Sequence, residues 1–410
     1  MISASDILLM NNTPQVSRLH IAIIGVRNAG KSSLLNAWTG QDVSIVSDVA
    51  GTTTDAVRKA VELPRLGACV LLDTPGFDDT DKQLGYLRID RMEASLKEAD
   101  IVILVASSPA ISDVEREWIG YLRRKGTAWL LVLGKADLVS EAEKIAEGLG
   151  KELKVSAVAV SALRGTGFDK LMESLLQLLP PDFGQETITG NLAKEGDRVI
   201  LVMPQDNAAP KGRLILPQVQ TIRELLDKHC IVTCCTPDKL REALDCFREN
   251  PDLIITDSQV FPQVFEQKPA GSKLTSFSVL FAAYKGDAKV MKQGAESIAY
   301  LTENSHILIA EACAHVPTGE DIGRVKLPRL LRKRLGEGLQ ISFVNGRDFP
   351  KDLSPYNLVI HCGACMFNRR YVLERIRTSQ EQHVPITNYG MAIAFLTGIL
   401  HQIDMDGVGE

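Results

Sequence analysis

The sequence Gly25-Val-Arg-Asn-Ala-Gly30-Lys31-Ser32 has the residue types and spacing of a phosphate-binding loop, G-x-x-x-x-G-K-[ST]. It follows an apolar stretch that predicts a buried strand, and it precedes a predicted helix. The glycines let backbone N–H groups point inward and the helix N-terminus adds positive potential, so such a turn binds phosphate oxygens. We expect Lys31 to reach the β- and γ-phosphates and Ser32 to bind Mg²⁺. The other loop residues predicted to contact a nucleotide are Gly25, Asn28, Ala29, Gly30 and Ser33.

Two downstream segments have residues that can respond to a γ-phosphate. The run Gly-Thr-Thr-Thr at 51–54 offers a switch threonine, Thr53, that can bind Mg²⁺. Asp73-Thr-Pro-Gly76 ends a predicted strand with a carboxylate that can face the metal and a glycine whose N–H can meet the γ-phosphate. The sequence therefore predicts triphosphate hydrolysis with Lys31, Thr53, Asp73 and Gly76 as the catalytic groups.

Two later segments could bind the base. Gly134-Lys-Ala-Asp137 and Ser161-Ala162-Leu each follow a predicted strand. Together with the preceding motifs, they resemble the Era and tRNA-modification group of translation-factor-like GTPases. The resemblance implies that the cofactor is GTP and that Asp137 binds the guanine N1 and exocyclic amine. It also implies that Lys135 packs along the base, and that Ser161 and Ala162 form the base-binding loop.

The resemblance covers about residues 15–180 and is broken at Gly134, where the family has asparagine. Loss of one hydrogen bond costs about 0.5–1.5 kcal/mol, so we expect weaker nucleotide binding with guanine preference retained through Asp137. Phe77 stands where a Ras-type protein has a water-orienting glutamine. In the resembling group, asparagine at the place of Asn28 helps hold K⁺, which predicts slow, K⁺-stimulated hydrolysis. The alternative is that Asn28 only favours the turn.

Three cysteines form a second group of residues with the potential for metal chemistry. Cys362-Gly-Ala-Cys365 follows an apolar strand predicted at 358–361, and Cys313 follows one predicted at 306–310. Parallel strands end at the same edge of a sheet, where open α/β folds bind ligands. We therefore expect the three thiols to meet there.

The number of ligands distinguishes the two candidate metals. Three thiolates suit a [4Fe–4S] cluster with one iron left to another ligand, whereas structural zinc would recruit His315 or His361 as a fourth. Each histidine is a candidate ligand, and the alternative is that it only hydrogen-bonds beside the metal. Asn368 can cap a following helix, whose N-terminus favours thiolates.

The pattern of strands and helices predicts an α/β fold. Short apolar strands alternate with amphipathic segments, which is typical of parallel sheets with helices on both faces. The predicted strands are 19–25, 68–73, 100–106, 129–134, 154–160, 198–203, 231–235, 253–256, 277–282, 306–310, 340–344, 358–361 and 384–387. Breaks at 180–181 and around 268–273 divide the 410 residues into three predicted domains, 1–181, 182–270 and 271–410.

The whole chain resembles the [FeFe]-hydrogenase maturation GTPases, the HydF family. The resemblance combines the GTPase motifs with the segment 209–221 and with Cys-x-His followed by His-Cys-x-x-Cys. It implies a Ras-like P-loop GTPase domain, a small α/β dimerisation domain and a doubly wound α/β domain in which Cys313, Cys362 and Cys365 hold a [4Fe–4S] cluster. It also implies a homodimeric scaffold that receives a diiron precursor made with two radical-SAM maturases and delivers it to apo-[FeFe]-hydrogenase.

Composition argues against some partners. A net charge of −5 gives no electrostatic footprint for nucleic acid. The N-terminus lacks a basic leader, and the most apolar late stretch, 391–400, is about half a bilayer span. We therefore expect a cytoplasmic protein without a membrane partner. The remaining thiols, at 69, 230, 234, 235 and 246, are expected to pack as small apolar groups. The basic run 324–334 is expected to be a solvated helix face or a docking site for an acidic partner.

Two other functions remain as alternatives. A ribosome-assembly or tRNA-modification GTPase of the Era group would predict a basic appended domain or a G-x-x-G clamp, and neither is evident in the sequence. A zinc-stabilised regulatory GTPase would bind zinc in place of iron. Metal content distinguishes these possibilities.

Overall fold

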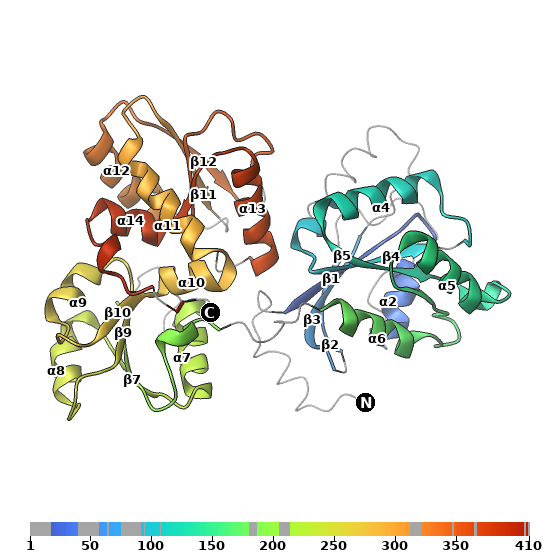
Figure 1. Ribbon diagram of the computed structural model, residues 1–410, viewed down its shortest axis with the longest axis horizontal. Helices are drawn as coiled ribbons and strands as arrows, with labels where there is room; N and C mark the ends of the chain where they lie inside the picture. The colour runs from blue at the N-terminus through green and yellow to red at the C-terminus, as the bar shows by residue number, and fades with distance from the viewer. Residues whose placement is uncertain are drawn as a thin grey trace. The chain divides into compact units, whose positions relative to one another are not determined.

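The computed structural model describes residues 18–39, 57–63, 65–74, 92–93, 95–106, 108–179, 187–204, 214–311, 321–346, 348–364, 367–405 and 407–408. The chain folds as two compact units, residues 1–183 and 184–410 (Figure 1). Both are built from largely parallel sheets flanked by helices, which confirms the predicted α/β class.

The first unit is built on a six-stranded sheet in the order β2-β3-β1-β4-β5-β6. Its strands are β1 (Leu19–Ile24), β2 (Val57–Leu63), β3 (Gly67–Asp73), β4 (Ile101–Ala106), β5 (Ala128–Leu133) and β6 (Ala157–Ala159). Only β2 runs antiparallel to its neighbour. Strand β2 is not predicted from the sequence, because its charged side chains interrupt any apolar run.

Helices cover both faces of this sheet. They are α2 (Lys31–Thr39), α4 (Asp113–Lys125), α5 (Ala142–Leu153) and α6 (Phe168–Leu178). Leu35 of α2 and Leu175 of α6 pack on the face that carries Ile23, whereas Ile119 of α4 packs on the face of Ile24. The strands are buried from both sides, so a ligand must bind in the loops at their carboxyl ends.

Helix α4 illustrates how local sequence sets an element. The Ser112 hydroxyl accepts a hydrogen bond from the Glu115 N–H at 3.3 Å, and the Glu115 carboxylate accepts one from the Ser112 N–H at 2.8 Å. This capping box satisfies N–H groups at the helix start. Gly126 ends the helix at φ 60°, a left-handed conformation that glycine adopts without a Cβ clash.

The second unit begins with a four-stranded parallel sheet in the order β10-β9-β7-β8. Its strands are β7 (Arg198–Val202), β8 (Ile231–Cys235), β9 (Leu253–Thr256) and β10 (Lys273–Ser276), and its helices are α7 (Leu216–Asp227), α8 (Leu240–Asp245) and α9 (Phe261–Gln267). Because β10 pairs with β9, the sheet continues past the boundary predicted at 270.

The strand predicted at 277–282 is wrong, because these residues belong to helix α10 (Phe277–Lys285). The Ser276 hydroxyl accepts a hydrogen bond from the Val279 N–H at 3.3 Å, which ends β10 and begins the helix. A short apolar run fits a buried helix as well as a strand, since hydrophobic periodicity cannot separate the two over so few residues.

A second parallel sheet follows in the order β12-β11-β13-β14. Its strands are β11 (His306–Glu311), β12 (Gln340–Asn345), β13 (Leu358–His361) and β14 (Ile386–Asn388), and its helices are α11 (Ala288–Glu296), α12 (Leu327–Leu335), α13 (Arg369–Glu381) and α14 (Tyr389–Leu396). Helices α12 and α14 contact the face of Ile309, whereas α13 contacts the face of Leu308 (Figure 1).

One hydrophobic core joins the two sheets of the second unit. Ile200 and Leu274 of the first sheet belong to the same buried cluster as Leu308 and Val359 of the second. Helix α10 also contributes Val279 to this cluster. The shared core explains why residues 184–410 form one compact unit although they contain two sheets.

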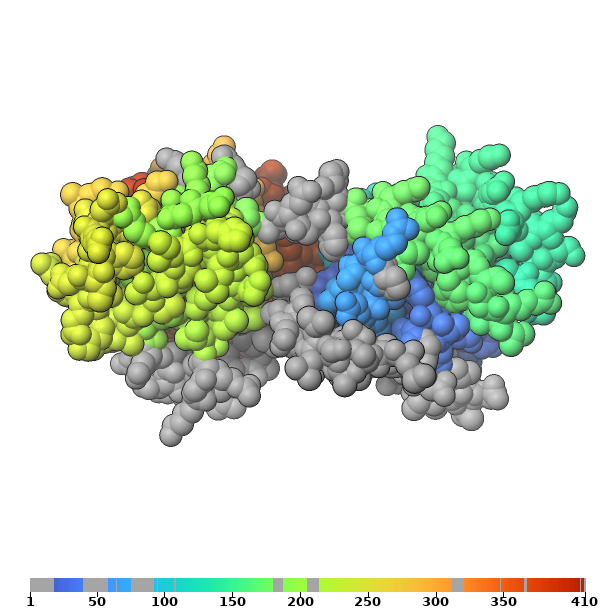
Figure 2. All heavy atoms as spheres, turned by 90° about the horizontal axis from the view of Figure 1, so that it is seen from below, coloured from blue at the N-terminus to red at the C-terminus, as the bar shows by residue number. Residues whose placement is uncertain are grey.

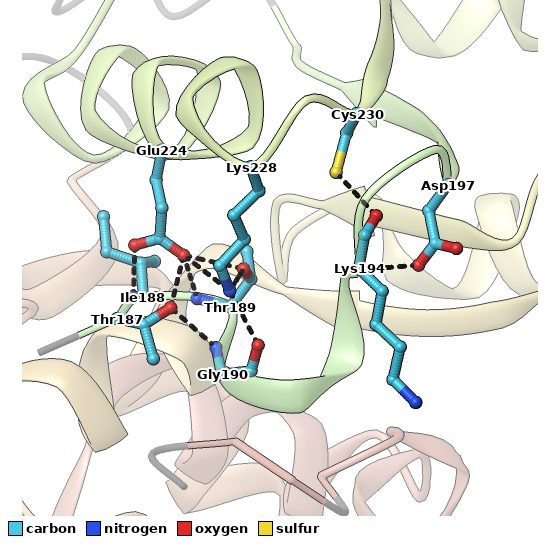
Figure 3. Close-up of polar contacts among 9 residues, drawn as sticks. All are labelled: Thr187, Ile188, Thr189, Gly190, Lys194, Asp197, Glu224, Lys228 and Cys230. Carbon is cyan, nitrogen blue, oxygen red and sulfur yellow. Dashed lines mark hydrogen bonds and ion pairs between the residues drawn. The ribbon is translucent and has the colours of Figure 1, made fainter. Parts of the chain in front are cut away.

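Glu224 of α7 anchors the start of the second unit (Figure 3). Its carboxylate accepts hydrogen bonds from the Thr187 hydroxyl at 2.7 Å and from the Ile188 N–H. It also accepts from the Thr189 N–H at 2.8 Å, and Lys228 Nζ lies 3.4 Å away. Burial opposes ionisation, but the donors outweigh it and hold the pKa of Glu224 below its usual value.

We expect Glu224→Gln to destabilise the second unit by about 2 kcal/mol at pH 7, because an amide replaces a charged acceptor of several hydrogen bonds. A carboxyl with a lowered folded-state pKa contributes stability above its unfolded pKa, here 4.5, and loses it as pH falls through the folded pKa. In urea unfolding, the difference from wild type should therefore shrink below pH 4.5. The exposed Glu242→Gln is the control. A difference that is the same at pH 7 and pH 3 would contradict this role.

Candidate functional site

The phosphate loop connects β1 to α2, as predicted. A Cβ atom added to Gly25 would lie 2.4 Å from the Val105 carbonyl oxygen of β4, so only glycine allows this close approach. Gly30 has φ +98°, which L side chains rarely adopt. Asn28 has φ 59°, a left-handed conformation that asparagine tolerates. The two glycines of the motif are thus required by the backbone.

The structure brings the predicted phosphate and Mg²⁺ residues together. Lys31 is buried, and its Nζ donates to the carbonyl oxygens of Gly25 and Val26, each at 2.9 Å. Ser32 Oγ donates to Asp73 Oδ2 at 3.0 Å across 41 residues of sequence. A hydroxyl and a carboxylate in contact beside a phosphate loop are oxygen ligands suited to Mg²⁺.

The residues predicted to bind the base also lie together. Ser161 Oγ donates to Asp137 Oδ1 at 2.5 Å, which joins the loops after β5 and β6 and lowers the pKa of Asp137. Ser161 is held in turn by two backbone hydrogen bonds to Thr166, each 3.1 Å long. Ala162 follows it directly. Asp137 is thereby oriented as an ionised acceptor, which suits the N1–H and amino donors of guanine.

Gly134 lies against the phosphate loop. A Cβ atom at this position would be 2.9 Å from the Ala29 carbonyl oxygen and 3.1 Å from Val105 Cγ1. The next residue, Lys135, has φ 53°, and its side-chain carbons come 3.9 Å from a Cβ placed on Gly30. Backbone contact at Gly134 thus replaces the side-chain tie that the family pattern predicts between these loops.

The other predicted site residues do not take part in these contacts. Ser33 lies exposed in the first turn of α2. The residues that lie outside the described part of the chain are Thr53, Gly76, Cys313, His315 and Cys365. Their roles stay predictions.

The cysteine loop after β13 is described as far as Ala364. The Cys362 N–H donates to the Ala310 carbonyl of β11 at 2.9 Å, which ties the loop to the strand that precedes 313. The Ala364 N–H points at Cys362 Sγ at 3.4 Å, and Ala364 has φ 50°. An N–H aimed at sulfur favours a thiolate. Asn368 accepts from the Tyr371 N–H at 3.2 Å, which confirms the predicted helix cap.

His361 is buried with both ring nitrogens engaged. Arg375 Nη1 lies 2.6 Å from His361 Nε2, and His361 Nδ1 lies 2.7 Å from the Cys362 carbonyl oxygen. A guanidinium can only donate, so Nε2 accepts and Nδ1 carries the proton. Burial and the positive charge of Arg375 lower the pKa of His361 to about 3. Because both ring nitrogens have partners, this arrangement favours a supporting role for His361, and its possible role as a metal ligand stays a prediction.

Two buried cations beside this loop, Arg375 and Lys285, are not predicted from the sequence. Arg375 and Lys285 are each 3% exposed, and Lys285 Nζ donates to the carbonyls of Ala364 at 2.9 Å and Phe367 at 3.1 Å. The sequence does contain one indication that Arg375 is buried. It follows Tyr371 by four residues, so both side chains lie on the buried face of α13. Positive charges buried beside a cysteine loop fit an anionic thiolate cluster.

The described residues do not by themselves form a metal site. Across the described ranges, no three His, Cys, Asp or Glu side chains are grouped closely enough to hold a metal ion. Cys362 is present, whereas the other two predicted thiols lie outside those ranges. In the same ranges, no helix is both long and apolar enough to cross a membrane.

Three family models match the chain. The 50S ribosome-binding GTPase model matches residues 20–135, which include the phosphate loop. The hydrogen maturase F dimerization domain matches 188–286, and the hydrogen maturase F tetramerization domain matches 289–403. The two maturase models together account for most of the second unit.

Individual relatives are GTPases. The chain is 36% identical over 165 residues to the GTPase Era of Carboxydothermus hydrogenoformans, a match covering 39% of the chain and 55% of the relative. It is 37% identical over 177 residues to the tRNA modification GTPase MnmE of Xanthomonas oryzae pv. oryzae, covering 43% and 37%. It thus spans about half and about a third of these relatives.

Solved structures of the same kind align with the chain. Aquifex aeolicus Era bound to GDP·AlF4⁻ aligns with 22% identity and a TM-score of 0.36, covering 56% of this chain and 98% of that one. The family models assign a GTPase domain to the first unit and both maturase domains to the second. On these matches, the chain belongs to the hydrogen maturase F family.

Proposed function

We propose that the chain is a GTP-hydrolysing iron–sulfur scaffold that carries a diiron precursor to apo-[FeFe]-hydrogenase, in concert with two radical-SAM maturases. The observation that carries the proposal is the presence on one maturase-family chain of two separate sites. One is the phosphate loop with its Ser32–Asp73 pair, and the other is the Cys362 loop with two buried cations beside it, Lys285 and Arg375.

The nucleotide site supports binding of Mg²⁺ and GTP. Lys31 can exchange its two carbonyl acceptors for β- and γ-phosphate oxygens, because its Nζ is already held inside the loop. Ser32 and Asp73, which are in hydrogen-bond contact, would hold Mg²⁺, and Asp137, oriented by Ser161, would hold guanine. Thr53 and Gly76 complete the proposed γ-phosphate contacts.

The cluster site rests on Cys362 and on two thiols predicted from sequence. Cys313, Cys362 and Cys365 would hold a [4Fe–4S] cluster, which supplies one iron open to a further ligand. His315 remains a candidate for that ligand. His361 and the Ala364 N–H keep Cys362 in place from the protein side.

We expect hydrolysis to be at least about tenfold faster in K⁺ than in Na⁺, because a positive charge near the γ-phosphate stabilises the transition state and Phe77 supplies none. Asn28, held at φ 59° in the loop, is the proposed K⁺ ligand. Phosphate release should be measured in KCl and NaCl at equal ionic strength. Asn28→Ala should remove the stimulation, whereas Asn36→Ala in α2 should keep it. Equal rates in the two salts would remove the K⁺ role.

The middle sheet offers a surface for a dimer. Strand β8 lies at its edge, and Ile231 is 58% exposed there. Exposed backbone groups and an apolar side chain on an edge strand favour pairing with another strand. Atoms of the middle segment, yellow-green in Figure 2, form an outer face of the second unit. We place the homodimer contact at the β8 edge.

Metal analysis tests the scaffold role. Protein purified anaerobically should contain iron and acid-labile sulfide and give a reducible EPR signal. Stoichiometric zinc without sulfide would instead favour a zinc-stabilised regulatory GTPase. The relatives' names favour a ribosome-assembly or tRNA-modification role only weakly. Tight RNA binding by protein that lacks both metals would support that alternative.

A further inference from the structure

Arg375 of α13 is a buried cation without an acidic partner. It is 3% exposed, and no Asp or Glu in the part of the chain that the structure describes forms an ion pair with it. Burying a guanidinium without a counter-charge is strongly unfavourable, so a negative charge from another source is expected nearby.

Aromatic rings and hydrogen bonds hold the guanidinium in one orientation. Its Cζ lies 4.7 Å from the ring centre of Phe349, 5.0 Å from that of Phe367 and 4.8 Å from that of Tyr371. Nη2 donates to the Gly346 carbonyl at 2.6 Å. Nε has no acceptor among the described residues. The packing fixes the charge while one N–H stays available.

Arg375 reaches the cysteine loop through His361. Its Nη1 donates to His361 Nε2, and His361 Nδ1 donates to the carbonyl of Cys362. Lys285 of α10 reaches the same loop from another helix, where it donates to the carbonyls of Ala364 and Phe367. Two buried positive charges therefore lie close to the loop that carries Cys362: Lys285 contacts it directly, and Arg375 does so through His361.

The two positive charges would stabilise a neutral thiol only weakly. A polar ligand at this sheet edge is also consistent with Tyr389, whose buried hydroxyl has no hydrogen-bond partner in the described ranges. Iron–sulfur clusters on thiolates carry net negative charge, and net charge and hydrogen bonding set their reduction potentials. The arrangement thus fits a ligand whose charge becomes more negative on reduction.

We propose that Arg375 is a positioning residue that, together with Lys285, raises the reduction potential of a cluster bound at Cys362. The inference rests on the proposed scaffold function. On reduction the cluster takes one electron from an external reductant such as dithionite, and no bond to the protein forms or breaks. A fixed positive charge favours the reduced form, because that form carries one more negative charge.

Arg375→Gln tests the charge, since glutamine can still donate to His361. At a fixed solution potential, the ratio of reduced to oxidised cluster should fall about tenfold, which is 59 mV for a one-electron couple. Redox titration followed by EPR measures the ratio. Arg375→Lys keeps the charge and should stay closer to wild type. Arg377→Gln, which removes an exposed charge from the same helix, should leave the ratio unchanged.

Each outcome decides the inference. A folded Arg375→Gln protein that retains iron with a ratio within about twofold of wild type overturns it. A folded Arg375→Gln protein that loses iron while Arg375→Lys keeps it supports the charge requirement. If circular dichroism shows that Arg375→Gln does not fold, Lys285→Gln is judged by the same criterion. Wild-type protein without iron and sulfide would instead refute the scaffold function itself.

Discussion

Cys362→Ser is expected to abolish bound iron and acid-labile sulfide while GTP hydrolysis stays near the wild-type rate. Changes in residues that only support a metal ligand cost about 10–100-fold in metal affinity, so loss of a thiolate itself should cost more. Cys362 belongs to the second unit and the phosphate loop to the first, so the substitution leaves Lys31 and Ser32 untouched. Iron and sulfide analysis after anaerobic reconstitution, with phosphate release on the same samples, measures both effects.

Cys246→Ser is the matched control for this experiment. Cys246 is an exposed thiol beside α8, so the packing predicted for it is wrong, and it donates to the Glu242 carbonyl at 3.3 Å. Its replacement should leave iron and sulfide unchanged. Full iron content in Cys362→Ser, or equal losses in the two variants, would argue against Cys362 as a cluster ligand.

Asp137→Asn should weaken GTP binding by about 10²–10⁴-fold, because two hydrogen bonds to a charged acceptor contribute about 1.5–3 kcal/mol each. Gly134 has no side chain to share base recognition, so the loss falls on Asp137. Binding of xanthosine triphosphate should improve, since its 2-oxo group can accept from the new amide. The Ser161 hydroxyl can still donate to the amide oxygen, which preserves the loop. Equilibrium titration with fluorescent nucleotides measures both affinities.

Asp169→Asn makes the same change of charge in the same unit. Asp169 is exposed in the first turn of α6, and its replacement should leave both affinities unaltered. A GTP affinity of Asp137→Asn within about threefold of wild type, or no gain for xanthosine triphosphate, would refute base recognition by Asp137.

Much of the nucleotide site could be predicted from sequence, because each motif is local and follows a strand. The Gly25–Ser32 loop needs only the turn between β1 and α2. The contacts between Ser32 and Asp73, and between Ser161 and Asp137, follow from parallel strands whose carboxyl ends share one edge. The close approach of Gly134 to the Ala29 carbonyl could not be predicted in this way, because it depends on three-dimensional spacing that no motif encodes.

The cluster loop could be predicted only in part. The strand before Cys362 and the Asn368 cap are local and were predictable. The cations were not, because Lys285 is separated from Ala364 by 79 residues and ends a helix whose first part, 277–282, the pattern predicts as a strand. Arg375 resembles any basic residue of an amphipathic helix until its burial is known.

The continuous core of the second unit joins the two segments that match separate family models. A cut between 286 and 289 would split a cluster that contains both Leu274 and Val359, and each fragment would expose an oily surface to water. The proposed dimer contact at the β8 edge and the proposed cluster binding at the cysteine loop would therefore both stabilise the same cooperatively folded unit. A ligand that binds only the folded state raises the free energy of unfolding. Binding of either the second subunit or the cluster would therefore stabilise all of residues 184–410.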